Sequence, residues 1–374
     1  MMALARLTII MILLIIWLIE LYITRVINPV FKTDTKSIHE NVKSGMFLEK
    51  EIYQYLDECK CWRNVTVIPS HHKMKNIDKQ LTNLSSDSCS NKSFERGIHQ
   101  KIVAYTYFEG SSFDKNSRNY LNGIEDNLQK IKILYGDTWI MRLYHDIPED
   151  SESLGKVCEI ACKNSMIELC NVNQNSNIYI KIGTTTSKTP QEGEPIHKIY
   201  PLIWRFLPIL DPNVDILLSR DLDSTITSRE VEAVKQFLNS SKDFHIIRDH
   251  PNHIQPIMGG LWGIKLADPE MRKTYQTLFK EALEDIKISL APRTERNHDQ
   301  ELLLKHFWPI VRNQAFMHDS YSCTKYWNSQ PFPTQRIKNE AGNFVGAVLS
   351  KHQKVPKPCP IHCRPYNHKD WSAC

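Results

Sequence analysis

Two acidic residues one position apart, Asp221 and Asp223, are the strongest chemical signal in the sequence. They follow an almost wholly apolar run at 214–218, which predicts a strand buried on both faces. In an α/β sheet the carboxyl end of such a strand opens into the ligand crevice. Carboxylate oxygens there suit Mg²⁺ or Mn²⁺, which fill their other positions with water or substrate phosphate. The stretch therefore predicts a divalent-cation site.

An acidic pair of this kind can also be a solvated turn or the beginning of a helix. Ser228 and Glu230, ahead of apolar residues at helical spacing, predict a helix over 229–238. That helix begins after the acidic pair and leaves it in the loop between strand and helix. We therefore interpret the pair as part of a ligand site.

The composition indicates a globular protein without a nucleic-acid partner. The chain has 374 residues, of which 41% are hydrophobic, enough for one large or two ordinary domains. Its formal net charge of +5 is too small to favour nucleic-acid binding.

An apolar run at 7–23 predicts a membrane anchor near the amino terminus. The run is long enough for a thin bilayer, and a cleaved signal peptide is the main alternative. We favour an uncleaved anchor because the run exceeds a usual signal core and no small-residue cleavage site follows it. The sequence thus predicts a cytoplasmic tail at 1–6, a signal anchor at 7–24 and a luminal stem at 25–96. The positive charges that flank the run, counted alone, would instead place the carboxyl-terminal side in the cytoplasm.

Two features outweigh those charges and place the remainder of the chain in the lumen. Four acceptor sequons for N-glycosylation begin at Asn64, Asn83, Asn91 and Asn239. Ten cysteines follow the anchor, which an oxidising compartment permits, and their pairing is not readable from the sequence. Zinc binding by Cys359, His362 and Cys363 is an alternative, but a second ligand pair at suitable spacing is missing. We expect a single-pass type II protein of the Golgi membrane.

The stem is polar and shows one plausible short helix, over 47–56. A small disulfide-linked subdomain around Cys59, Cys61 and Cys89 is the alternative interpretation.

The main domain is expected over 97–350, as an α/β fold with a mixed, mostly parallel sheet flanked by helices. Its first half alternates strands and helices in the manner of βαβ units. The expected strands are 101–107, 139–144, 166–172, 214–218, 244–249, 257–265 and 314–322. The expected helices are 119–134, 152–163, 195–207, 229–238, 268–286 and 297–307. A basic, Cys- and Pro-rich extension follows at 351–374.

Four motifs together resemble GT-A fold glycosyltransferases, which have a Rossmann-like fold and use nucleotide sugars. They are Arg-Asp-Leu-Asp-Ser at 220–224, Gly-Gly-Leu-Trp-Gly at 259–263, His-Asp-Gln-Glu-Leu-Leu at 298–303 and Met-His-Asp at 317–319. The resemblance covers about residues 97–330. The third motif is similar to the glycogenin-like retaining branch, but Gln-Glu-Leu stands where that branch has a second Asp or an Asn. Retention and inversion therefore both stay open.

The resemblance implies roles for particular residues. Asp223 would bind Mn²⁺ or Mg²⁺ directly, Asp221 would contact the metal or the ribose, and His318 would complete the metal site. Gly259 and Gly260 would lie against the sugar. The donor would be a nucleotide sugar of the uridine diphosphate type, and the acceptor a glycan or glycoprotein.

The resemblance also implies that Asp299 faces the reacting centre and that the end of the first strand, near Tyr105 and Tyr107, binds the base of the donor. From the chemistry, Arg205 or Arg220 could supply a fixed positive charge to the diphosphate. In an inverting reaction the general base would be Asp299 or Asp249. In a retaining reaction Asp299 would position or stabilise the sugar cation.

Two other functions are compatible with the sequence. A two-metal phosphodiesterase or nuclease would need further ligands, such as Asp249, His250 and His253. A non-enzymatic, membrane-anchored ectodomain would bind glycans or polyanions through its basic tail at 351–369.

Overall fold

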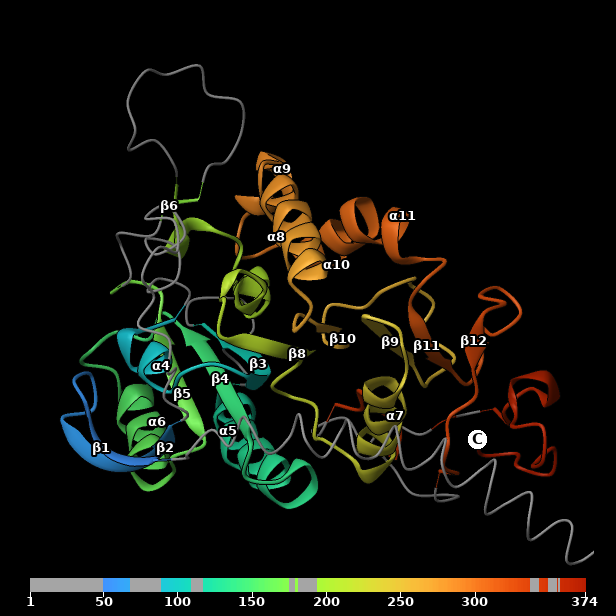
Figure 1. Cartoon of the computed structure of the whole chain (residues 1–374), viewed down its shortest axis with the longest axis horizontal. Coiled ribbons are helices and arrows are strands. Elements are labelled where there is room, and N and C mark those ends of the chain that lie inside the picture. Colours follow the sequence, from blue (N-terminus) through green and yellow to red (C-terminus); the bar gives the residue numbers. More distant parts are fainter. Residues whose placement is uncertain are drawn as a thin grey trace, which may run out of the picture. The chain divides into compact units, whose positions relative to one another are not determined.

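An eight-stranded mixed sheet forms the centre of the molecule (Figure 1). Its strands lie in the order β12-β11-β9-β10-β8-β3-β4-β5. They are β3 (Gln100–Tyr107), β4 (Trp139–His145), β5 (Ile167–Asn171), β8 (Val214–Arg220), β9 (Phe244–Arg248), β10 (Leu261–Lys265), β11 (Phe316–Asp319) and β12 (Ser329–Gln330). Strand β10 runs antiparallel to β8 and β9, and the other neighbouring pairs are parallel. The mixed, mostly parallel α/β sheet is thus confirmed, and it is consistent with a Rossmann-like fold.

The computed structural model describes residues 50–67, 89–108, 117–174, 179–180, 194–336, 343–348, 355 and 357–374. All of these belong to one compact unit, Glu49–Cys374. The predicted tail and anchor, at 1–6 and 7–24, lie outside the described residues. Within the described residues, every helix is too short or too polar to cross a membrane.

Helices cover both faces of the sheet (Figure 1). Below it in this view lie α5 (Ser117–Lys130), α6 (Glu152–Lys163) and α7 (Ser228–Asn239), and above it α8 (Pro269–Leu283), α9 (Ile286–Ser289), α10 (His298–Leu302) and α11 (Trp308–Val311). Because side chains alternate along a strand, Val103 and Tyr105 of β3 pack in the core with α5 and α6. Ile102 and Ala104 pack in the opposite core with α8 and α10.

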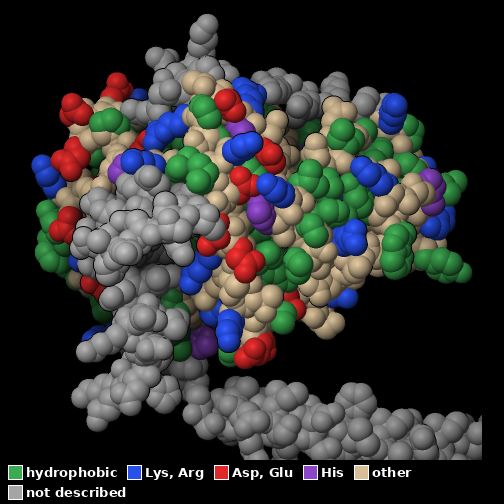
Figure 2. All heavy atoms as spheres, turned by 90° about the horizontal axis from the view of Figure 1, so that it is seen from above, with side chains coloured by type: hydrophobic (Ala, Val, Ile, Leu, Met, Phe, Trp, Pro, Cys, Tyr) green, Lys and Arg blue, Asp and Glu red, His purple; other side chains and the backbone are tan. Residues whose placement is uncertain are grey.

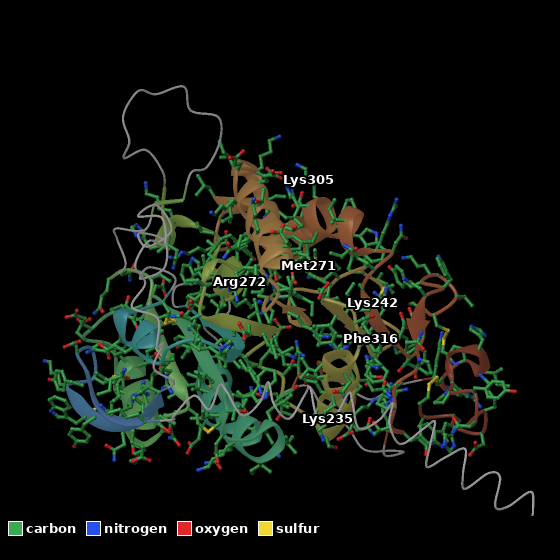
Figure 3. All side chains as sticks on the ribbon, in the orientation of Figure 1. Lys235, Lys242, Met271, Arg272, Lys305 and Phe316 are labelled. Atoms are coloured by element: carbon green, nitrogen blue, oxygen red, sulfur yellow. A yellow bond between two sulfur atoms is a disulfide. The ribbon has the colours of Figure 1, made fainter. Side chains whose placement is uncertain are left out.

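Helix α8 is fixed above the amino-terminal end of β8 through Arg272 (Figure 3). The Arg272 guanidinium donates to the Asp211 carbonyl at 2.9 Å and to a carboxylate oxygen of Asp215 at 3.2 Å. These contacts leave the opposite, carboxyl end of β8 open to other segments.

The helix expected at 195–207 forms instead as two 3₁₀ segments, η4 (Ile196–Lys198) and η5 (Pro201–Leu210). Pro208 lacks a backbone N–H for an α-helical bond, and η5 is buried over most of its length. A short β-pair, β6 (Tyr179–Ile180) with β7 (Glu194–Pro195), precedes it.

The helix expected at 297–307 is confirmed but continues further. Helix α10 passes through the π-turn η6 (Leu303–Phe307) into α11. Pro309 lies in the first turn of α11, where its missing N–H needs no helical partner. The long helix expected at 268–286 ends earlier, at Leu283, and the π-turn η3 (Ile131–Tyr135) extends α5.

The amino-terminal described segment is a hairpin of β1 (Lys50–Leu56) and β2 (Cys61–Val67). The helix expected at 47–56 is therefore wrong over residues 50–56. Inward and outward side chains alternate along both strands, with Arg63, Val65 and Val67 buried, and the segment is rich in aromatic and β-branched residues.

Disulfides join this hairpin and the segment before β3 to the sheet. The pairs are Cys59–Cys158, Cys61–Cys162 and Cys89–Cys170. The first two link the hairpin to α6, and the third links β5 to the residues before α4 (Asn91–Glu95). The described parts of the predicted stem at 25–96 thus belong to the same unit as the sheet. The compact unit begins at about residue 49 and not at 97.

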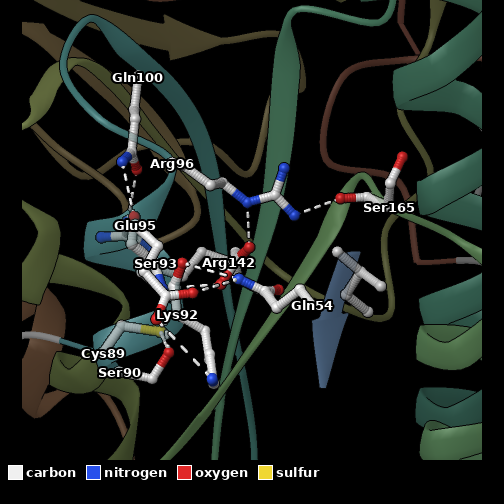
Figure 4. Close-up of polar contacts among 12 residues, drawn as sticks. Gln54, Cys89, Ser90, Lys92, Ser93, Glu95, Arg96, Gln100, Arg142 and Ser165 are labelled. Carbon is white, nitrogen blue, oxygen red and sulfur yellow. Dashed lines mark hydrogen bonds and ion pairs between the residues drawn. The ribbon is translucent and has the colours of Figure 1, made fainter. Parts of the chain in front are cut away.

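A buried ion network reinforces this junction (Figure 4). Arg63 lies 3.5 Å from a carboxylate oxygen of Glu168, and Arg96 contacts the same oxygen. Arg96 also donates to the Ser165 carbonyl, and Ser93 donates to Glu168 at 2.9 Å. Burial opposes ionisation of Glu168, but the charges of Arg96 and Arg63 outweigh it and lower its pKa.

The carboxyl-terminal extension is also bound to the domain. Cys323 pairs with Cys363, and Cys359 pairs with Cys374, the last residue. The Cys374 carbonyl accepts a hydrogen bond from Ser320 at 3.2 Å. Since both sulfurs of the alternative zinc set, Cys359 and Cys363, are in disulfides, they are not available as thiolate ligands.

Candidate functional site

Helix α5 holds the acidic loop that follows β8. The loop turns tightly, with the Ser224 N–H donating to the Asp221 carbonyl at 3.1 Å. The Asn127 side chain donates to the Leu222 carbonyl and accepts from the Ile226 N–H, each at 3.2 Å. Both ends of the loop are therefore fixed by one residue of α5.

Gly123 lets α5 approach this loop closely. A Cβ at this position would lie 2.2 Å from the Leu222 carbonyl oxygen. Thr225 adds a hydrogen bond of 2.6 Å to Asp126, also on α5. These contacts hold the loop backbone while Asp221 and Asp223 remain partly exposed at its surface.

Arg205 joins the acidic loop to Asp299, 94 residues away in the sequence. Its Nη1 donates to Asp221 Oδ1 at 2.5 Å and its Nη2 to Asp299 Oδ2 at 2.6 Å. The side chains of Arg205 and Asp299 are each only 3% exposed, whereas that of Asp221 is 44% exposed. Arg205 thus orients two carboxylates. The donor-binding role expected for it stays a prediction, since its described contacts are with these carboxylates.

Gly259 and Gly260 lie against the same two carboxylates. A Cβ on Gly259 would be 1.8 Å from Asp299 Oδ2, and one on Gly260 would be 2.2 Å from Asp221 Oδ2. They precede β10 and do not belong to it, because the strand expected at 257–265 begins only at Leu261. Only residues without a side chain allow this approach. The structure therefore brings the glycine motif to the acidic loop.

Asp299 lies in the first turn of α10. The preceding Asn297 has a φ of 72°, a left-handed conformation that Asn tolerates better than most residues. Burial and the neighbouring charge of Asp221 raise the pKa of Asp299, and Arg205 only partly offsets them. Its carboxylate therefore binds a proton more readily than an ordinary aspartate.

Tyr120 and Arg296, which the sequence did not single out, and His253, expected only for a second metal, lie near the acidic loop or near one another. Burial and then the charges of Asp223 and Asp221 raise the pKa of Tyr120, on α5, to about 12. The exposed Arg296 opposes that shift. Burial lowers the pKa of His253 to about 4, although the charges of Asp249 and Asp221 oppose the decrease. Tyr120 and His253 are thus within electrostatic reach of Asp221, and Arg296 is within reach of Tyr120.

Arg220 and Tyr105 face the core between the sheet and α5 to α7. Arg220 donates to Glu230 at 2.6 Å and to the Trp262 carbonyl at 2.8 Å, and it is buried. Tyr105 is also fully buried, and burial followed by the charge of Glu230 raises its pKa well above the ordinary value. The donor-binding roles expected for both residues are therefore corrected, since neither side chain is presented to a ligand.

Tyr107, at the carboxyl end of β3, is buried on the same side of the sheet. Its hydroxyl lies 3.4 Å from the Ser153 hydroxyl at the beginning of α6. Its ring is therefore not exposed to a base in this conformation.

His318 lies apart from the acidic loop. Its Nδ1 is 2.8 Å from Nε2 of His245, and its Nε2 is 2.9 Å from Oε1 of Gln236. Strand β11 is three strand spacings from β8, which is roughly 14 Å. Since both ring nitrogens have partners, a buried histidine and the exposed Gln236, neither of which belongs to the acidic loop, the metal-ligand role expected for His318 is corrected. Burial lowers its pKa to about 3.

Asp249 is a structural carboxylate. It accepts from Arg229 through both oxygens at 2.8 Å, from Arg336 at 2.8 Å and from Ser320 at 2.7 Å. Burial alone would raise its pKa, but Arg229 and Arg336 lower it. Asp249 is therefore poorly placed as a general base or as a ligand of a second metal, and the hydrolase alternative loses its main carboxylate.

The basic tail uses part of its charge internally. Arg364 donates to the Cys359 and Lys369 carbonyls, and Lys369 donates to the Arg364 carbonyl at 2.8 Å. On the face shown in Figure 2, acidic and basic side chains are interspersed over the left and central parts. The internal hydrogen bonds of Arg364 and Lys369 leave less of the tail's basic charge for a polyanion.

The described sequons differ in position. Asn64 lies in β2 and Asn239 is the last residue of α7, and both are exposed. Asn91 is the first residue of α4. Asn83 lies outside the described residues.

Comparison with known proteins does not assign a family. Neither a protein-family model nor a curated protein matches the chain. One similar solved structure is a glycosyltransferase involved in the glycosylation of the major capsid of PBCV-1, with 13% identity over 61% of this chain and 89% of that one, and a TM-score of 0.29. Another is a 4-diphosphocytidyl-2C-methyl-D-erythritolsynthase from Anaerococcus prevotii, with 14% identity over 58% of this chain and 87% of that one, and a TM-score of 0.31. TM-scores this low carry no functional argument. The site must be interpreted from its own geometry.

Proposed function

We propose that the chain is a metal-dependent glycosyltransferase with a GT-A fold. It would transfer a sugar from a nucleotide-diphosphate donor to a glycan or glycoprotein acceptor in the Golgi lumen. The observation that carries the proposal is the contact of Arg205 with both Asp221 and Asp299. The buried Arg205 guanidinium thereby joins two parts of the proposed site. One is the acidic loop, which is expected to hold a metal, and the other is the Asp299 carboxylate, which is expected at the reacting centre.

Asp221 and Asp223 would hold Mn²⁺ or Mg²⁺, since both offer carboxylate oxygens at the open end of β8. When bound, such a cation offsets the negative charge that develops on a departing diphosphate. The chain's own contribution is to hold the two carboxylates in place. Asn127 and Gly123 fix the loop backbone, and Arg205 fixes the Asp221 side chain.

Asp299 would act on the sugar or the acceptor. Its buried position and raised pKa suit a group that takes up an acceptor proton, and its contact with Arg205 fixes its direction. Gly259 and Gly260 would let both carboxylates lie directly against the backbone, beside which the donor sugar would bind. The exposed Arg296 is a better candidate than Arg205 or Arg220 for contact with the diphosphate.

The luminal setting is supported by the cysteines. All ten form disulfides, the state that an oxidising compartment favours. The predicted anchor and the four sequons agree with a type II membrane protein of the secretory pathway. Uridine diphosphate sugars are the proposed donors.

Thermal unfolding of the purified full chain with a panel of nucleotide-diphosphate sugars tests the proposal. We expect one donor class to raise the melting temperature only when Mn²⁺ is present. A ligand at 100 times its Kd stabilises the folded state by about 2.7 kcal/mol. Asp223→Asn should abolish this increase, whereas Asp137→Asn, at an exposed aspartate outside the site, should preserve it.

Transfer activity completes the test. Turnover that persists in Asp223→Asn, or in excess chelator, would contradict a metal-dependent transferase. Counting bound metals separates it from the hydrolase alternative, because we expect one site and a hydrolase would need two about 4 Å apart.

A further inference from the structure

An exposed aromatic stack lies on the outward face of the β1–β2 hairpin. The rings of Tyr53 and Trp62 are parallel within 6°, with centroids 5.0 Å apart, and the ring of Tyr55 lies 5.0 Å from the indole at a tilt of 49°. Tyr53 is 65% exposed and Trp62 is 55% exposed. Stacking accounts for the contact between the rings but leaves a large apolar area in water, which commonly marks a surface that another group covers.

An N-glycosylation sequon occupies the same face of the hairpin. Asn64 pairs directly with Tyr53 across the two strands, and Tyr55 pairs with Trp62. Since side chains alternate along a strand, Trp62, Asn64 and Thr66 all point outward, and all three are exposed. The acceptor amide thus stands beside the aromatic stack, and the threonine that completes the sequon follows on the same face.

We propose that Asn64 carries an N-linked glycan whose first N-acetylglucosamine covers the Tyr53–Trp62 stack. In the transfer, Asn64 Nδ2 bonds to the anomeric carbon of a lipid-diphosphate-linked oligosaccharide. The bond from that carbon to phosphate breaks, the lipid diphosphate leaves, and the amide gives up one proton. The C–H face of the sugar then packs on the rings and removes apolar surface from water.

The outer face of the hairpin would gain buried area from such a cover. A two-stranded sheet is marginally stable alone and depends on packing of one face. The inner face supplies it through Arg63, which donates to the carbonyls of Ala161 and Ile167. The outer face has no such described contact beyond its own aromatic rings, so the glycan would complete the burial of the hairpin. This inference goes beyond the proposed enzyme activity and rests on the proposed function only for the luminal setting.

Glycopeptide mapping and thermal unfolding of the full chain from a glycosylating eukaryotic host test the inference. We expect Asn64 to be largely occupied. Thr66→Val removes the sequon but keeps a β-branched residue, and it should lower the melting temperature by about 2 °C, equivalent to roughly 1 kcal/mol. Thr66→Ser keeps the sequon and serves as the matched control.

The aromatic contact is tested in a second background. In Tyr53→Thr, the difference between the occupied and unoccupied forms should fall close to zero. An equal difference in both backgrounds would show that the sugar does not pack on the stack. An unmodified Asn64 would overturn the site itself and leave the stack for a protein or membrane partner. Neither readout involves a nucleotide sugar or a metal, so failure here is separate from failure of the proposed enzyme activity.

Discussion

Arg205 Nη2 lies 2.6 Å from Asp299 Oδ2, and both side chains are almost fully buried. Removing one partner of such a pair leaves an unbalanced buried charge, at a cost of about 3–5 kcal/mol. The second Nη of Arg205 contacts Asp221, which is partly exposed. The Arg205 guanidinium therefore fixes the partly exposed carboxylate of Asp221 relative to the buried carboxylate of Asp299. Substitution of Arg205 should affect function as well as stability.

Arg205→Lys should lower transfer activity by about 100-fold. A lysine ammonium is a single point charge and cannot hold two carboxylates through a planar fork. Steady-state kinetics with a fixed Mn²⁺ concentration measures the effect, which should appear mainly in kcat. Arg220→Lys is the matched control, because Arg220 pairs with Glu230 in the core. Equal activity losses in the two variants would mean that Arg205 acts only through stability.

Gly260→Ala should abolish metal-dependent donor binding. The new Cβ would lie 2.2 Å from Asp221 Oδ2, so the carboxylate must move away from its present position. Donor-induced thermal stabilisation in Mn²⁺ measures the loss. Gly155→Ala in α6 is the control, since a Cβ there meets nothing within 4 Å, and it should stabilise the helix by about 0.5–1 kcal/mol. A Gly260→Ala variant that keeps normal donor binding would remove Asp221 from the site.

Only the resemblance to GT-A fold glycosyltransferases implied that the acidic loop, the glycine motif and Asp299 share one site. In the structure the glycines precede β10, which runs antiparallel to β8, so they meet the loop at the carboxyl end of β8. The signal for α5 was also present, as a helix-interior Gly123 four residues before Asn127, but its partner in the loop was not readable. The positions of Tyr120 and Arg296 near this loop also follow from tertiary packing that the sequence does not reveal.

The incorrect expectations for Arg220 and His318 have two sources, the direction in which a strand residue points and the order of strands in the sheet. Arg220 has the same parity as Ile216 and Leu218, which face α5 to α7, so alternation alone indicates an inward direction. His318 required knowledge that β11 lies three strands from β8. Disulfide pairing likewise depends on three-dimensional proximity, which explains why the hairpin at 50–67 was mistaken for part of a stem.

Arg296→Ala should weaken donor binding about fivefold, the equivalent of roughly 1 kcal/mol. Arg296 is exposed and close enough to Tyr120 and Tyr200 to oppose the rise in their pKa. A single exposed charge facing a diphosphate contributes about 1 kcal/mol, and the effect should shrink as salt screens it. Titration calorimetry at low and high salt measures both quantities. Arg312→Ala, at another exposed arginine, should leave the affinity unchanged.

Acid should destabilise the fold through His318. Burial lowers its folded pKa to about 3, whereas the unfolded value is 6.5, so the unfolded state binds the proton first as pH falls. The stability contributed by neutral His318 is complete above pH 6.5 and is lost progressively between pH 6.5 and 3. At pH 5 the loss should be about 2 kcal/mol, at about 1.4 kcal/mol per pH unit.

Denaturant unfolding between pH 7 and pH 5 measures this slope. His318→Gln should reduce this slope by about 1.4 kcal/mol per pH unit, because glutamine does not titrate. The part due to His245, which is also buried and has its own pKa well below the usual value, should remain. The same variant should keep the full Mn²⁺-dependent increase in melting temperature, since His318 contacts His245 and Gln236 and not the acidic loop. Loss of that increase together with an unchanged acid slope would restore His318 as a metal ligand and contradict its assignment to the core.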